Sequence, residues 1–95
     1  MNELLLNQLR GIASRYPEIE SVLLFGSRAH GDCNHLSDID IAIKAPNIPQ
    51  KDWLLLTEQI ENELDTLLKI DLVLYDRVSE ELRVQIDQCY QVLYR

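Results

Sequence analysis

The chain has 95 residues, 46% of them hydrophobic, which suits one small domain over residues 1–95 with a single core. Sixteen acidic residues stand against nine basic ones, and the net charge of −7 argues against a protein that binds DNA or RNA. Because we find neither a leader segment nor a run of about 18 apolar residues, we expect a cytoplasmic protein with no membrane contact.

The first half of the chain predicts one helix and two strands. Apolar residues recur at helical spacing from about Asn2 to Tyr16, and Pro17 is a natural stop. The segment from Ser21 to Phe25 is short and apolar and ends at Gly26, which predicts a buried strand. After an irregular loop, a second strand is predicted from about Ser37 to Lys44.

The second half predicts two more helices around a third strand. A long helix is expected from about Gln50 to Leu68, a strand from Ile70 to Tyr75, and a final helix from about Ser79 to Tyr94. A strand, a crossover helix and another strand normally form a right-handed parallel pair. We therefore expect the second and third strands to be parallel.

Two carboxylates share one face of the second predicted strand. Strict alternation places its isoleucines on one side and Asp38 and Asp40 on the other. Positions two apart in a strand are about 6.5 Å apart, so both side chains can reach one cation, and oxygen ligands favour Mg²⁺ or Mn²⁺. The simpler interpretation is that both aspartates lie on a solvated face of the strand. Aspartate is a poor strand former, however, so two of them within this strand suggest a functional role.

A third aspartate stands among apolar residues in the third predicted strand. Asp71 lies near the start of that strand, as Asp38 and Asp40 lie near the start of theirs, so parallel strands would bring all three to one end of the sheet. Gly26 lies at the far end of the first strand. That strand must run antiparallel to the second for its turn to reach the aspartates, so we expect a mixed sheet.

The turn after the first strand has features of a phosphate site. Gly26 permits close approach to the backbone, Ser27 offers a hydroxyl, and Arg28 offers a fork suited to phosphate oxygens. A short helix opening at Ser27 would present unpaired N–H groups to an anion. Taken alone, Gly-Ser is more often an ordinary turn. Combined with paired aspartates, it indicates a nucleotide site.

This combination resembles a known signature. Gly26-Ser27, ten residues and Asp38-Ile39-Asp40 are similar to the Gly-Ser-(ten residues)-Asp-x-Asp motif of the polymerase-β-like nucleotidyltransferase superfamily. The local sequences LFGSRAHGD and SDIDIAI resemble its minimal branch, the MntA-type antitoxins encoded beside HEPN-domain toxins. The chain departs from this pattern at His30, where arginine is commoner. With Asp71, the resemblance covers nearly the whole chain.

The resemblance implies an α/β (α+β) fold, with a small mixed sheet of three to four strands backed by helices. It implies transfer of AMP from ATP to a tyrosine of a cognate HEPN-type ribonuclease toxin, within a hetero-oligomer, with two Mg²⁺ ions. The implied site residues are catalytic and metal-binding Asp38, Asp40 and Asp71, and nucleotide-binding Gly26, Ser27 and Arg28.

Two alternatives stay open from the sequence. One is a non-catalytic antitoxin that neutralises its partner by binding alone. The other is the catalytic subunit of a small-molecule nucleotidyltransferase that a separate acceptor-binding chain completes, because no sequence here is left over to close around a small acceptor.

Overall fold

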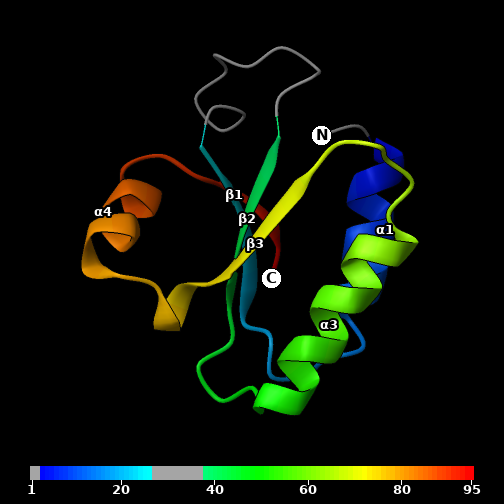
Figure 1. Cartoon of the computed structure of the whole chain (residues 1–95), viewed down its shortest axis with the longest axis horizontal. Coiled ribbons are helices and arrows are strands. Elements are labelled where there is room, and N and C mark those ends of the chain that lie inside the picture. The colour runs from blue at the N-terminus through cyan, green and yellow to red at the C-terminus, as the bar shows by residue number, and fades with distance from the viewer. Residues whose placement is uncertain (1–2, 27–37) are drawn as a thin grey trace.

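The computed structural model describes residues 3–26 and 38–95. Helices and strands alternate along most of the chain, and the last element is a strand (Figure 1). In order, the elements are α1 (Glu3–Ala13), β1 (Ser21–Phe25), β2 (Ile39–Lys44), α3 (Gln50–Glu63), β3 (Ile70–Leu74), the 3-10 turn η1 (Tyr75–Arg77), α4 (Glu80–Gln88) and β4 (Gln91–Tyr94).

The strands form one mixed sheet in the order β3-β2-β1-β4. Strand β1 runs antiparallel to both β2 and β4, and β2 runs parallel to β3. The predicted mixed sheet, with an antiparallel first pair and a parallel crossover pair, is therefore confirmed. The crossover helix α3 makes the parallel pairing possible because it returns the chain to the end of the sheet where β2 begins.

The sheet lies between α1 and α3 on one side and α4 on the other (Figure 1), and a hydrophobic cluster lies on each side. Helices α1 and α3 cover one face, where Leu9, Ile41 and Ile60 belong to the larger buried cluster. Helix α4 covers part of the other face, where Ile86 packs with Leu23 of β1 and other small or apolar residues. The alternation predicted for β2 holds, since its isoleucines face the larger cluster and the residues between them face the α4 side.

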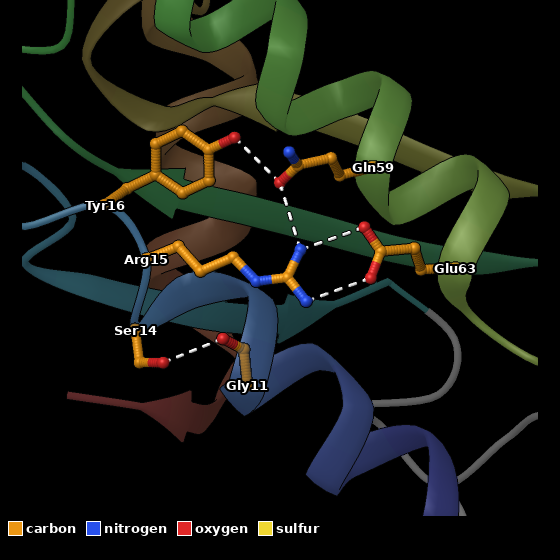
Figure 2. A network of polar contacts seen from close by, with 6 residues as sticks. All are labelled: Gly11, Ser14, Arg15, Tyr16, Gln59 and Glu63. Atoms are coloured by element: carbon orange, nitrogen blue, oxygen red, sulfur yellow. Dashed lines mark hydrogen bonds and ion pairs between the residues drawn. The ribbon is translucent and has the colours of Figure 1, made fainter.

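A polar network ties the end of α1 to α3 (Figure 2). The Arg15 guanidinium donates to both carboxylate oxygens of Glu63, at 2.9 and 3.0 Å. Beside it, the Tyr16 hydroxyl donates to Gln59 Oε1 at 2.8 Å. The two-point contact restricts the orientation of the guanidinium, and it links the end of α1 to α3 at the surface, beside the buried core that the two helices share.

Two predicted boundaries are wrong. Helix α3 ends at Glu63, not near Leu68, because the chain turns at Leu64, whose backbone is extended (φ −72°, ψ 129°), to reach the start of β3 beside β2. The predicted final helix ends at Gln88, and residues 91–94 form β4 instead. The open edge of β1 offers that last segment backbone hydrogen bonds that a longer helix would forgo.

Among the described residues, no helix has the length and apolar character needed to cross a membrane.

Candidate functional site

Two carboxylates meet at one end of the parallel strand pair. Asp40 of β2 is the direct register partner of Asp71 of β3. Paired residues of neighbouring strands point to the same face and lie about 4.8 Å apart in the backbone. Val73 and Tyr75 alternate with Asp71 and pack on the α4 side, so both carboxylates belong to that face.

The charges at this end repel each other. Partial burial raises the pKa of the Asp40 carboxyl above its ordinary value, and the negative charges of Asp71 and Asp38 raise it further. Lys69 acts in the opposite direction, and its Nζ lies 3.5 Å from Asp71 Oδ1. One exposed lysine thus offsets part of a negative field that a divalent cation would offset more completely.

Asp38 stands at the entrance to β2, exposed to solvent. Within the part of the chain that the structure describes, no three acidic, histidine or cysteine side chains stand close enough to hold one metal ion. The donor chemistry nevertheless fits Mg²⁺, since the half-exposed carboxylates of Asp40 and Asp71 lie side by side and a third carboxylate, Asp38, stands just before β2. Binding of an ion requires these side chains to draw closer together, which the exposed position of Asp38 allows.

The turn after β1 touches this carboxylate pair. Phe25 is the register partner of Asp40, and Gly26 follows it with φ +75°, a left-handed conformation that glycine adopts without strain. A Cβ at Gly26 would overlap the carboxylate of Asp40. The backbone therefore approaches Asp40 as closely as it does only because the residue is glycine. Ser27 and Arg28, the other predicted phosphate ligands, lie outside the described residues.

Sequence reasoning did not single out Lys69. The sequence could have indicated it, because Lys69 stands two positions before Asp71 and residues two apart lie on the same side of an extended chain. Its backbone also contributes, because the Lys69 carbonyl accepts the Ile39 N–H at 2.9 Å and so helps to align the starts of β2 and β3.

The fold is that of a polymerase-β-like nucleotidyltransferase. The family described as Polymerase beta, Nucleotidyltransferase matches residues 7–95, so the chain belongs to the polymerase beta nucleotidyltransferase family. A search of curated protein sequences finds no significant match.

Comparison with solved structures shows that the chain is similar to proteins of toxin–antitoxin complexes. The chain is 27% identical to a toxin–antitoxin structure with AMP-PNP, with a TM-score of 0.73 over 93% of this chain and 71% of the other. It is 25% identical to a chain from the tri-AMPylated Shewanella oneidensis HEPN toxin in complex with MNT antitoxin, with a TM-score of 0.71 over 98% and 71% of the two chains.

A more distant neighbour shares the fold alone. A putative nucleotidyltransferase from Sulfolobus solfataricus has a TM-score of 0.60 and 22% identity over 95% of this chain and 76% of the other. Because MntA–HepT toxin–antitoxin structures also stand among the neighbours, the resemblance to MntA-type minimal nucleotidyltransferases is confirmed.

Proposed function

We propose that this protein is an antitoxin that transfers AMP from ATP to a tyrosine of a HEPN-type ribonuclease toxin encoded by a neighbouring gene. The observation that carries the proposal is the register pairing of Asp40 with Asp71 beside the Gly26 turn. The relatives add support, because one was solved with AMP-PNP and another holds a tri-AMPylated HEPN toxin.

The proposed roles follow from position. Asp38, Asp40 and Asp71 would hold two Mg²⁺ ions, which supply positive charge for the transferring phosphoryl group and the leaving pyrophosphate. Gly26 would bring its backbone and the Asp40 carboxylate together at the nucleotide, and Ser27 and Arg28 would bind the β- and γ-phosphates.

The reaction we propose is an in-line displacement. The tyrosine oxygen attacks the α-phosphorus, the bond from that phosphorus to the bridging oxygen breaks, and pyrophosphate leaves on the side of the Gly26 turn. Asp71 lies in the edge strand on the opposite side, where its carboxylate would accept the proton of the incoming tyrosine hydroxyl. Pyrophosphate therefore leaves on the β1 side of the carboxylate pair, and the acceptor tyrosine enters on the β3 side.

Labelled ATP tests the proposal directly. The purified protein is incubated with ATP labelled at the α-phosphate, Mg²⁺ and the HEPN-domain protein encoded beside it, and label is expected on a tyrosine of that protein. An Asp38→Asn, Asp40→Asn double variant should still bind the toxin but leave it unlabelled and active.

The alternatives predict other results. If the double variant neutralises the toxin as well as the parent does, the antitoxin works by binding alone. Label that appears only in a low-mass product would indicate a small-molecule nucleotidyltransferase instead.

A further inference from the structure

The position of β3 determines from which side an acceptor can reach the site. Strand β3 is an edge strand, and Asp71 lies near its start. The Gly26 turn, where the proposed reaction releases pyrophosphate, lies across β2 on the side of β1. An in-line displacement requires the attacking oxygen to enter opposite the leaving group. The acceptor must therefore approach from beyond β3, where the connection from α3 to β3 lies (Figure 1).

This connection, residues 64–69, has an exposed apolar side chain next to a small cavity. Leu67 is fully exposed, whereas Leu64, three residues earlier in the same connection, is buried in the core. The cavity measures about 250 Å³ and is lined by Glu61, Thr66, Leu68, Lys69 and Ile70. Pockets that hold whole small molecules measure roughly 300–1,000 Å³, so this one suits a single side chain better than a nucleotide.

Lys69 joins the cavity to the catalytic end. It lines the cavity and also contacts the Asp71 carboxylate at 3.5 Å. Lys69 therefore lies between the cavity and the carboxylate at which the acceptor hydroxyl would react. The cavity lies on the α3 side of the sheet and the carboxylates lie on the α4 side, so an acceptor docked at the cavity would reach Asp71 around the edge of β3.

The basic residue that lines the cavity, Lys69, is already paired with Asp71, so the unpaired charges around the cavity are negative and favour a basic side chain. Among the described residues, Glu61 takes part in neither of the two ion pairs, which join Arg15 to Glu63 and Lys69 to Asp71. Asp65 is also exposed in the same connection, and the chain as a whole carries a net charge of −7. Unpaired carboxylates at the rim of an interface attract a positively charged partner and speed its association.

Hydrogen bonds hold the connection in shape before any partner arrives. The Asp65 N–H donates to Gln8 Oε1 of α1 at 3.0 Å, and the Leu68 N–H donates to Thr66 Oγ1 at 3.1 Å. The Thr66 N–H donates to the Leu64 carbonyl at 3.0 Å. A surface that is already ordered loses little conformational entropy on binding.

We propose that this surface, made of Glu61, Leu67 and the cavity beside Lys69, is the docking site for the acceptor protein. This rests on the proposed function and adds where and how its protein substrate binds. The segment that docks carries an arginine or lysine, which enters the cavity and pairs with Glu61, and an apolar residue that covers Leu67. Its acceptor tyrosine then reaches the Asp71 side of the carboxylate pair.

Single substitutions test the docking site. Leu67→Ala and Glu61→Gln should each raise the KM for the HEPN-domain protein, and its dissociation constant measured without ATP, by about fivefold or more, as for residues central to an interface. The KM for ATP should stay unchanged. Because both residues are exposed, the thermal midpoint should also stay unchanged. Raising the salt concentration should weaken the parent protein's binding more than that of the Glu61→Gln variant.

Helix α4 supplies a matched control. Val84 is exposed as well and lines a second cavity with Glu80, Glu81 and Gln85, on the other face of the sheet. Val84→Ala should leave acceptor binding unchanged. If Val84→Ala weakens binding and the Leu67 and Glu61 variants do not, the partner docks on α4 and the inference is overturned.

Binding and labelling separate the two proposals. A partner that binds in a Leu67-dependent way but is not labelled supports the docking site and refutes the proposed transfer. A partner that the parent protein and both variants label with equal KM refutes the docking site and leaves the transfer intact.

Discussion

The carboxylate of Asp40 occupies the space that a side chain at Gly26 would need. This contact joins the turn after β1 to the carboxylate pair of β2 and β3, the two parts that a nucleotide and its metal ions would share. Strand register brings them together, because Phe25 pairs with Asp40 and Asp40 pairs with Asp71.

Gly26→Ala should therefore reduce both activity and stability. A left-handed conformation costs an L-residue about 1–2 kcal/mol, and the added methyl group would push the Asp40 carboxylate away from Asp71. We expect nucleotidyl transfer to fall at least about tenfold, which corresponds to about 1.4 kcal/mol in the barrier. Release of labelled pyrophosphate and urea unfolding measure the two effects.

Gly11→Ala is the control for this substitution. Gly11 lies in helix α1, and a methyl group there would have no atom within 4 Å apart from its chain neighbours and the backbone of its own helix. Alanine in a helix is more stable than glycine by about 0.5–1 kcal/mol, so this variant should be slightly more stable and fully active. Equal losses in the two variants would contradict the special role of Gly26.

Asp40→Asn should stabilise the metal-free protein at neutral pH. Because the folded state raises the pKa of Asp40, the ionised carboxylate lowers the stability of the parent protein at every pH above that pKa. This penalty fades as the pH falls through the raised pKa and the folded carboxylate takes up a proton. The variant's advantage in thermal midpoint should accordingly be largest near neutral pH and shrink in acid.

Thermal melts in EDTA across a pH series measure this difference. Addition of Mg²⁺ and a non-hydrolysable ATP analogue should reverse the order, because only the parent protein keeps the full set of carboxylates. An Asp40→Asn variant that is less stable than its parent in EDTA at neutral pH would rule out the repulsion we infer.

The contact between Arg15 and Glu63 should also make the stability depend on pH, but as a stabilising contribution where ionised Asp40 is destabilising (Figure 2). The hydrogen bonds from Arg15 lower the pKa of Glu63. Its contribution to stability is therefore complete above the ordinary glutamate pKa and is lost as the pH falls through the lowered one. Glu63→Gln should lower the thermal midpoint at neutral pH, with less effect in acid and at high salt. Glu61→Gln, which removes a carboxylate outside both ion pairs of the described residues, should not.

Truncation in the larger core should be costly. Ile41 is fully buried in β2, one of the two inner strands, on the face that α1 and α3 cover. Ile41→Ala removes apolar contacts and leaves a cavity, for an expected loss of about 2–5 kcal/mol. Leu54→Ala, at an exposed position of α3, should change stability by less than about 0.5 kcal/mol. Denaturant midpoints compared at constant m-value check both.

Local pattern alone determined much of the fold and of the candidate site. The alternation in β2 was enough to place its isoleucines against the helices and Asp40 on the other face, because side chains in a strand repeat every two residues. The right-handed crossover then made β2 and β3 parallel, which put Asp71 beside Asp40. Ser27 and Arg28 as phosphate ligands stay predictions.

Tertiary structure decided the rest. Residues 91–94 continue the apolar spacing of α4 and also suit a strand, so their pattern fits either structure. The open edge of β1 made them β4, because pairing there satisfies backbone groups on both strands. Likewise, Leu64 stands four residues after the buried Ile60 and would face the core in a longer helix as well, so its pattern did not reveal that α3 ends at Glu63. The spacing of apolar residues predicts which side chains are buried. It does not predict which helix or strand will pack against them, because that depends on how the whole chain folds.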